Sequence, residues 1–291
     1  MPVDFPASPA TNQIYSYNNK SWTWNGTAWL STQPSTSIGN TFSSGRLTLS
    51  SGTPVPSVNL TSTTVYYTPF SGNRISLYDG SSWSTYAFTE RSLALSGTAN
   101  YDIFMYNNAG TLTLESTAWA SDTVRSTALV LIDGVYLKSG ALTRRYLGTI
   151  RVSGGTCFDS NEKRYVWNLN NKTERIVYKN TFDTYAYTGH TYTAGAWRSW
   201  NNDTNQKVEF VVGINSGISV GFGSAGGGFT SQGAAWDGAT PGYDSVDVNA
   251  RAGRTYSTRS NVLGFHYITM MEYGSSGTTY IHAILEGTFW C

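Results

Sequence analysis

The stretch from residue 143 to 169, TRRYLGTIRVSGGTCFDSNEKRYVWNL, constrains the fold of this chain more than any other part of the sequence. Side chains of different character alternate along its two halves with the period of a strand, not that of a helix. Rings as large as those it contains need cover, so we expect other segments to pack on both strands. The residues expected to share one face are Tyr146, Gly148, Ile150 and Val152 in the first strand, and Tyr165, Trp167 and Leu169 in the second.

The composition of the whole chain supports a β protein. The 291 residues can bury a sizeable core and provide two or three folded units. Charged residues make up 13%, whereas aromatic residues reach 14% and glycines number 30. Charged residues usually account for about 25% of soluble domains. This mixture suits half-buried strands joined by tight turns and does not favour long amphipathic helices.

Turn dipeptides between apolar runs predict hairpins. Asn25-Gly26 is flanked by tryptophans, and residues 107–110 and Asp133-Gly134 each separate two apolar runs. Both central residues of a type I′ turn need positive φ, which Asn, Asp and Gly tolerate. LGFHYITMMEY and TYIHAILEGTF predict a long C-terminal hairpin around residues 274–277, and only residues 120–131 offer room for a short helix. The expected fold class is all-β: antiparallel β-sandwich or jelly-roll domains with a small N-terminal β-hairpin module.

Composition shifts along the chain predict four segments. The first is rich in tryptophan, the second is rich in Ser and Thr, and the last two contain most of the strand-like runs. Within the last segment, residues 221–244 are so rich in glycine that we expect an irregular loop there. The expected boundaries are 1–33 for the hairpin module, 34–52 for a linker with a weak strand at 46–49, 53–155 for a central β domain, and 156–291 for a C-terminal β-sandwich domain.

Charge and hydropathy argue against several classes of partner. The net charge of +1 gives no electrostatic reason to expect nucleic acid, and no apolar run approaches the length of a membrane span. The opening MPVDFPASPATN lacks the basic and apolar regions of a secretory signal. We therefore expect Cys157 and Cys291 to be free thiols in a reducing compartment, with a disulfide between them as the alternative.

Two short motifs of catalytic and nucleotide-binding proteins occur in one segment. Residues 217–221 match the G-x-S-x-G pattern of a nucleophile elbow, and residues 221–226 match G-x-G-x-x-G. Both motifs work only where a strand turns into a helix, which exposes the serine or directs the helix dipole at a phosphate. Here Ile218, Val220 and Phe222 alternate as in a strand interior and glycines follow. We therefore interpret both matches as structural.

Titratable residues show no spacing typical of a reaction centre. The three histidines are His190, His266 and His282, and neither cysteine has a partner at metal-ligand spacing. In the expected C-terminal hairpin, His266 would lie across from Glu286, and His282 near Met270 or Glu272. No spacing pairs the carboxylates as glycoside hydrolysis requires. We expect no catalytic residue, no metal site and no cofactor; the carboxylates considered are Asp237, Asp244, Glu272 and Glu286.

Aromatic residues outside the strong strands are the better functional candidates. Trp197 and Trp200 lie in the polar segment AWRSWNND, and Trp236 and Tyr243 lie in the expected glycine-rich loop. Exposed Trp and Tyr rings bind sugar rings or fill protein interfaces with little entropy loss. We predict binding at these four residues, while the alternative for each ring is a place in the core of its own domain.

Two blocks of the sequence resemble a known class of proteins. The opening DFPASPATNQIYSYNNKSWTWNGTAW resembles the WNG-type N-terminal module of many tailed-bacteriophage fibre and virion proteins. The central blocks are similar to a region common in phage and prophage structural proteins, often called tail fibres. They read NYDIFMYNNAGTLTLESTAW, DTVRSTALVLIDGVYLKSGALTRRYLGTIRVSG and KRYVWNLNNK. The resemblance covers most of the chain and is strongest from about residue 100 to 212.

The resemblance implies a non-enzymatic virion structural protein, assembled in the host cytoplasm and exposed on the particle as a tail-fibre component. Residues 1–33, with Trp22, Trp24 and Trp29, would dock to other virion proteins, and the chain would form a homo-oligomer, a trimer by analogy. Contact with a host surface glycan is a further hypothesis. The alternatives are a capsid decoration or head-fibre protein and, third, a polysaccharide-degrading tailspike.

Overall fold

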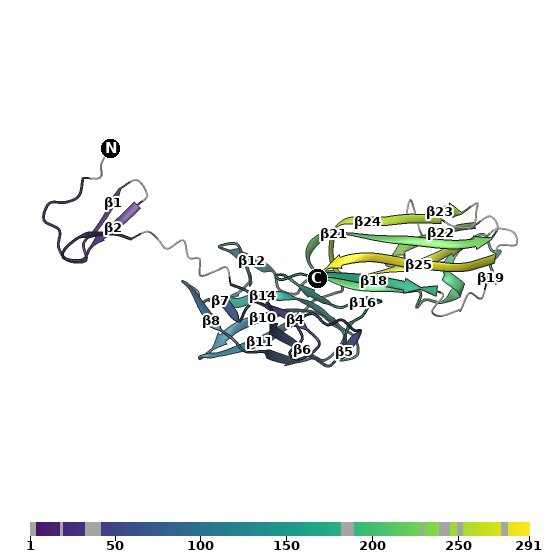
Figure 1. The fold of residues 1–291 in the computed structure, drawn as a ribbon, viewed down its shortest axis with the longest axis horizontal. Helices are drawn as coiled ribbons and strands as arrows, with labels where there is room; N and C mark the ends of the chain where they lie inside the picture. The colour runs from purple at the N-terminus through teal and green to yellow at the C-terminus, as the bar shows by residue number, and fades with distance from the viewer. Residues whose placement is uncertain are drawn as a thin grey trace.

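A computed structural model describes residues 4–17, 20–32, 42–181, 189–227, 230–238, 245–248, 253–274 and 279–291. The elements named within these ranges are strands and a 3-10 turn at Trp200–Asn202. The strands form several antiparallel sheets, so the predicted all-β fold class is confirmed (Figure 1). Residues 120–131 contain no helix; their regular part is strand β12 (Leu129–Ile132). Within the described ranges no helix is long and apolar enough to cross a membrane.

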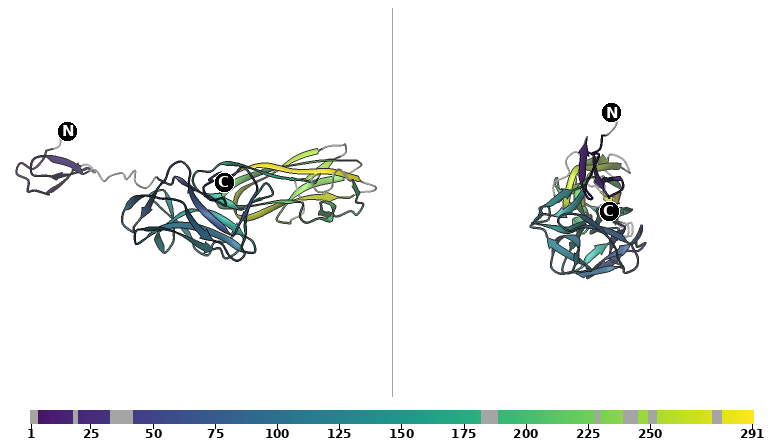
Figure 2. Two further views of the ribbon diagram at one scale, coloured as in Figure 1. Left: turned by 60° about the horizontal axis from the view of Figure 1, so that its bottom comes forward. Right: turned by 90° about the vertical axis from the view of Figure 1, so that its left-hand side faces the viewer.

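The N-terminal module is a three-stranded sheet, where a two-stranded hairpin was expected. Its strands β1 (Ile14–Tyr17), β2 (Lys20–Trp24) and β3 (Trp29–Thr32) pair with no other sheet in the described ranges. The module lies apart at the N-terminal end of the molecule in Figure 1 and in the left view of Figure 2. With β1 added, the central strand β2 pairs with a neighbouring strand on each side, whereas a strand in a lone hairpin has one neighbour.

The turn between β2 and β3 is not the expected type I′ turn. Of its central residues only Gly26 has positive φ, at 96°. The side chain of Asn25 instead accepts hydrogen bonds from the amides of Thr27 and Ala28, at 2.9 and 2.8 Å. This side-chain bonding stabilises a four-residue loop in place of a two-residue turn. The predicted Asp133-Gly134 turn, by contrast, has φ of 49° and 80°, so that hairpin is confirmed.

The central block is a sandwich around one core. One side is a sheet with strand order β11-β10-β14-β13-β12, to which β17 adds on β14. The other side is the sheet β4-β6-β9 and the hairpin β7-β8. The remaining strands of the first sheet are β10 (Ala99–Asn108), β11 (Thr111–Ala118), β13 (Val135–Lys138), β14 (Ala141–Val152) and β17 (Val166–Asn168). Those of the second side are β4 (Gly45–Thr48), β6 (Thr64–Pro69), β7 (Arg74–Tyr78), β8 (Trp83–Ala87) and β9 (Arg91–Ala94).

The C-terminal body is built on two 21-residue strands, β21 (Lys207–Gly227) and β24 (Gly253–Tyr273), which pair with each other. In Figure 1 they run along the long axis of the molecule. Short strands β5, β15 and β16 continue the same sheet toward the central block. The other strands are β5 (Leu60–Ser62), β15 (Cys157–Asp159), β16 (Lys163–Arg164), β18 (Glu174–Asn180), β19 (His190–Thr191), β20 (Trp197–Ser199), β22 (Thr230–Trp236), β23 (Ser245–Val248) and β25 (Thr279–Trp290).

Two sequence predictions for this body are wrong. The last two strands do not form a hairpin: β24 pairs with β20, β21 and β22, whereas β25 pairs with β18, β19 and β21. The described part of the glycine-rich stretch 221–244 is mainly strand and not an irregular loop, because 221–227 continue β21 and 230–236 form β22. Both errors have one cause. The long alternating strand β21 offers pairing edges on both sides, and glycines within it make room for neighbouring side chains.

The predicted segment boundaries also need correction. Residues 42–52 are not linker, because β4 lies in the core and Leu47 is 1% exposed. The side chain of Asn168 holds this strand by accepting from the Leu47 amide and donating to its carbonyl. The boundary at 155/156 is crossed by the sheets: Cys157 and Tyr165 belong to the core of the central block. The central block and the C-terminal body therefore share strands.

Residues 143–169 contribute to both cores of the protein. Tyr146 and Trp167 belong to the core of the C-terminal body, whereas Leu147 and Ile150 belong to that of the central block. The pairing of β14 with β10 shifts register between Gly148 and Tyr146, which is a β-bulge. A bulge adds one residue to one strand, so Tyr146 does not share a face with Ile150 as strict alternation predicted.

Candidate functional site

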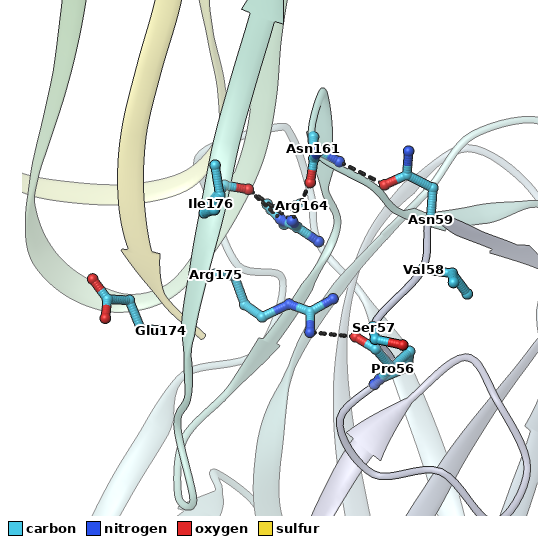
Figure 3. A pocket seen from close by; sticks show the side chains of 9 residues that line it. All are labelled: Pro56, Ser57, Val58, Asn59, Asn161, Arg164, Glu174, Arg175 and Ile176. Carbon is cyan, nitrogen blue, oxygen red and sulfur yellow. Dashed lines mark hydrogen bonds between the residues drawn. The ribbon is translucent and has the colours of Figure 1, made fainter.

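One cavity lies where the central block meets the C-terminal body. It has a volume of about 210 Å³ and is drawn in Figure 3 with its lining residues. Arg164 donates to the Ile176 carbonyl at 2.8 and 2.7 Å, and Arg175 reaches across to the Pro56 carbonyl at 2.5 Å. Both guanidinium groups also form ion pairs with Asp159, at 2.7 and 3.3 Å. These bonds engage both arginines with protein acceptors, so we interpret this cavity as a structural junction.

A larger groove adjoins this cavity at Ile176 and is the stronger candidate site. Its volume is about 560 Å³, and it lies on the outer face of strands β18, β25, β21 and β24. The strand register places Tyr178, Glu286, Gly221 and Tyr256 in one row across the four strands. Neighbouring residues on these strands, such as Val177 and Leu285, point to the core on the other side. The full lining is Ile176, Tyr178, Ser219, Gly221, Tyr256, Glu286, Gly287 and Thr288.

Gly221 allows the ring of Tyr256 to lie across the sheet. A Cβ atom at Gly221 would lie 3.2 Å from Tyr256 Cε1, closer than most such contacts. The ring therefore covers the glycine while Tyr256 itself stays 62% exposed. Aromatic cover of a strand glycine also stabilises a sheet without any ligand. In this groove the same arrangement leaves a large ring open to solvent.

Exposed apolar side chains gather around the groove. Ile176 is 56% exposed, and Trp290, four residues beyond Glu286 on the same face of β25, is 60% exposed. Hydroxyl groups alternate with these side chains: Ser219 and Thr258 are hydrogen-bonded to each other at 2.8 Å. The groove thus combines rings, hydroxyls and the carboxylate of Glu286 on one flat β face, which suits a ligand with both apolar and polar surfaces.

The three predicted binding residues that the structure describes do not line this groove. Trp200 and Trp236 are 1% and 2% exposed and belong to the core, so the prediction of surface rings is wrong for both. Their alternative role as core rings applies, because Trp236 packs edge-on to Phe210 with ring centroids 5.7 Å apart. Trp197 is half-buried against Tyr273 on β24. Tyr243 lies outside the described residues.

The predicted docking tryptophans form a cluster within the N-terminal module. Phe5 stacks on Trp29 and meets Trp22 edge-on, with centroids 5.2 Å apart in both cases. Trp24 lies 5.6 Å from Trp29. Each of these tryptophans is half-buried. The opposite face of the sheet carries Ile14 and Leu30, which are 69% and 54% exposed and flank Thr23 in the strand register.

The remaining titratable residues are engaged in separate clusters. Glu272 is fully buried and binds His190 and Arg198, each at 2.6 Å, at the far end of β24. His282 bonds to Asn180 and not to Met270 or Glu272, because β25 does not pair with β24 as a hairpin would require. No group of three or more potential metal ligands occurs among the residues that the structure describes. Asp244 lies outside them.

Both cysteines are free thiols, as predicted. Cys157 is fully buried, and burial raises the pKa of its thiol well above the usual value. Cys291 is 2% exposed, and its backbone pairs with Thr173 at 2.9 and 3.2 Å. Burial raises the pKa of Cys291 to about 11, so neither thiol is ionised near neutral pH.

The hydrogen bonds of His266 require its imidazole ring to be protonated. Its Nδ1 lies 2.9 Å from a carboxylate oxygen of Asp237, and its Nε2 lies 3.1 Å from the Leu263 carbonyl. Both partners only accept, so both ring nitrogens must carry a proton. Burial opposes this charge, but the bond to Asp237 outweighs it and raises the pKa of His266, despite Arg259 nearby. The predicted contact with Glu286 is wrong, because His266 pairs in register with Phe210.

A pH-dependent contribution to stability follows from this pair. Because the folded-state pKa of His266 is raised, its stabilisation is complete below the unfolded value near 6.5 and is lost as pH rises through the folded value. The free energy of unfolding, measured by urea titration between pH 5.5 and 9, should therefore fall more with pH in the wild type than in His266→Gln. Asp237→Asn should likewise lose the extra fall of the free energy of unfolding with pH. Parallel curves of that free energy against pH for the wild type and both variants would contradict the charged His266–Asp237 pair.

The comparisons with known proteins leave the family open. No protein-family model matches the chain, and no curated protein matches it. Among solved structures, the chain is similar to a calcium-binding mutant of β-glucuronidase 2 from Bacteroides uniformis, with a TM-score of 0.20 and 12% sequence identity. That alignment covers 80% of this chain, which spans only 28% of the other chain. A likeness this distant carries no argument about function.

Proposed function

We propose that this chain is a non-enzymatic structural protein of a bacteriophage particle, a tail-fibre component anchored through residues 1–33 and exposed along its β body. The observation that carries the proposal is the separate N-terminal sheet with its own ring cluster of Phe5, Tyr15, Trp22, Trp24 and Trp29. A unit held together by its own rings can dock to a partner without disturbing the rest of the chain. The elongated body in Figures 1 and 2 supports the same role.

The structure favours one face of the module for docking. The predicted tryptophans pack against Phe5 and one another, whereas Ile14 and Leu30 lie exposed on the opposite face. Exposed apolar pairs of this kind on a small rigid sheet are suited to an interface core. We therefore assign the contact with other virion proteins to the face of Ile14 and Leu30, and the tryptophans to holding that face flat.

The test is incorporation into particles. A chain without residues 1–33, and a full chain with Ile14→Ser and Leu30→Ser, should both be lost from purified virions in quantitative immunoblots. Val58→Ser is the matched control, because Val58 is also exposed, at 63%, but lies in the β body. Normal occupancy of the truncated chain would refute the docking role. Thermal unfolding of each purified variant shows whether the β body remains folded.

Imaging of particles distinguishes the proposed tail fibre from the alternative of a capsid decoration or head-fibre protein. A label on the β body should lie on the tail, and a label on the head would favour the alternative. The proposed homotrimer rests on analogy, and light scattering of the purified chain tests it by mass. A polysaccharide-degrading tailspike would release oligosaccharide from host glycan, whereas the proposed protein releases none.

A further inference from the structure

We propose that copies of this chain associate through the outer face of β18, β25, β21 and β24, with Trp290 of one copy packed in the groove of the next. The inference deepens the homo-oligomer of the proposed function and rests on that proposal for the number of copies. Among the described residues of 174–291, the large apolar side chains that are exposed all lie on this face. They are Ile176, Tyr256 and Trp290, which are 56%, 62% and 60% exposed.

Trp290 projects from a backbone that is held in place on both sides. The side chains of Phe289 and Cys291 are 3% and 2% exposed, so they point into the core and the ring between them points outward. Trp290 is paired with Glu174 on β18, and the backbones of Cys291 and Thr173 exchange two hydrogen bonds, at 2.9 and 3.2 Å. An aromatic side chain on a fixed backbone loses little entropy when a partner covers it, and tryptophans of this kind are enriched among the residues that dominate interface energies.

The groove provides a complementary hollow on the same face. Its volume is about 560 Å³, and the ring of Tyr256, which lies across Gly221, forms an aromatic platform within it. Ile176 lines the same groove with an exposed apolar side chain. An indole ring packed on this platform gains ring–ring contact in addition to the apolar surface that it covers. The groove is therefore suited to receive a tryptophan side chain.

Ring and groove lie on one face of one chain, which makes this face complementary to itself. Trp290 is four residues from Glu286 along β25, and four residues of an antiparallel strand span about 14 Å. A twofold axis midway between ring and groove places each ring in the groove of the other copy. A closed ring of three copies makes the same contact from each copy to the next. The contact is thus defined by its residues, and the number of copies follows from the measured mass.

The exposed apolar area fits a protein partner. A fully buried aromatic side chain covers about 150–250 Å², so the exposed parts of Tyr256 and Trp290 together leave about 200–300 Å² to be covered. A standard interface buries about 800 Å² per partner and has an apolar centre with a polar rim, so an area of this size suits the centre. Glu174 beside Trp290 and the Ser219–Thr258 hydroxyl pair supply polar groups around it. Glu286 is not a free carboxylate, so covering the groove does not leave it as an isolated charge.

Light scattering of the purified full chain over a range of concentrations tests this surface. The wild type should have the mass of two or three copies. Trp290→Ala should raise the dissociation constant at least about tenfold, as expected when a dominant interface ring is lost. Trp290→Phe keeps a ring and should retain most of the association. Phe70→Ala is the matched control, because Phe70 is also exposed, at 43%, but lies in the central block. Thermal unfolding shows whether each variant remains folded.

A mixture of two defective variants tests the contact itself. Ser219 lines the groove and is exposed, so Ser219→Arg should fill the groove with a charged side chain and weaken association as Trp290→Ala does. In the mixture, the Ser219→Arg copy keeps the ring and the Trp290→Ala copy keeps the groove. Mixed oligomers with one intact contact should therefore form, whereas each variant alone has none. Association in the mixture no stronger than in the separate variants would refute the contact.

Two further outcomes would overturn the proposal: a monomeric wild type, or an oligomer that Trp290→Ala leaves unchanged. In the second case the homo-oligomer stands and a different surface forms it. In the first case the homo-oligomer fails as well, whereas the tail location and the docking of residues 1–33 stand or fall by the particle experiments. A monomeric wild type that binds immobilised oligosaccharide, and loses that binding in Trp290→Ala, would assign the face to a glycan instead.

Discussion

Replacing Arg125 with alanine is expected to lower the free energy of unfolding by about 3–5 kcal/mol, because it leaves a buried carboxylate without its counter-ion. Arg125 Nε lies 2.6 Å from Asp102 Oδ2, and the two side chains are 13% and 3% exposed. The same guanidinium donates to the Gly213 carbonyl on β21 and to the Tyr146 hydroxyl. It also lies over the Trp119 ring, 4.4 Å from the centroid. One side chain therefore joins three strands at the boundary of the two cores.

Urea denaturation of the purified chain measures this effect, and Arg144→Ala is the matched control. Arg144 pairs with Glu115 at 3.2 Å, but its side chain is 31% exposed and Lys138 also binds that carboxylate. A half-exposed pair contributes under about 1 kcal/mol. Equal losses in the two variants would contradict the buried role. The double variant Arg125→Met, Asp102→Leu should recover stability relative to Arg125→Ala, because it removes the orphaned charge as well.

Gly213→Ala is expected to destabilise the protein by about 3 kcal/mol or more, at the upper end for overpacked cores. A Cβ atom there would lie 2.3 Å from the Tyr146 hydroxyl, 2.4 Å from Trp167 Cε3 and 2.7 Å from Thr149 Oγ1. Tyr146 and Trp167 are 0% and 1% exposed, so neither ring has free space to move into. The methyl group would also disturb the Thr149 hydroxyl, which donates to Asp102 at 2.6 Å.

The control for this variant lies four residues further along the same strand. A Cβ atom at Gly217 would have the Arg259 carbonyl as its nearest neighbour, at an ordinary 3.8 Å. Gly217→Ala should therefore change the midpoint of thermal unfolding little, whereas Gly213→Ala should lower it by several degrees or prevent folding. Because a variant that fails to fold yields no midpoint, soluble yield in parallel expressions is the second measurement. Equal behaviour of both variants would show that β14 and β21 do not approach as described.

Local patterns predicted local structure well in this chain. Alternation in residues 143–169 indicated strands, and Asp133-Gly134 indicated its hairpin, because both depend on a few adjacent residues. The bulge at Tyr146 and Gly148 was not predictable, because it depends on how β14 pairs with β10. The same holds for β21. Its edges are filled by β24 and β25, and no local signal distinguishes that arrangement from a hairpin of the last two strands.

The candidate groove was missed for the same reason. Its residues come from four strands that are far apart in the sequence, so no motif connects Tyr178, Gly221, Tyr256 and Glu286. The one usable signal was a strand glycine in alternating sequence, which indicates that something lies over it. Trp200 and Trp236 were predicted to be exposed because they occur in polar and glycine-rich segments, but both side chains fill the core. A polar segment around a ring does not establish that the ring itself is exposed.

The long ladder between β21 and β24 has a mechanical consequence. Its paired residues extend from Lys207 and Thr269 at one end to Ser224 and Gly253 at the other, along the long axis of the molecule (Figure 1). Backbone hydrogen bonds in an antiparallel ladder lie perpendicular to the strands, so tension along that axis loads them in shear and together, not one after another. A body built this way resists stretching between its two ends, as the proposed tail-fibre role would require.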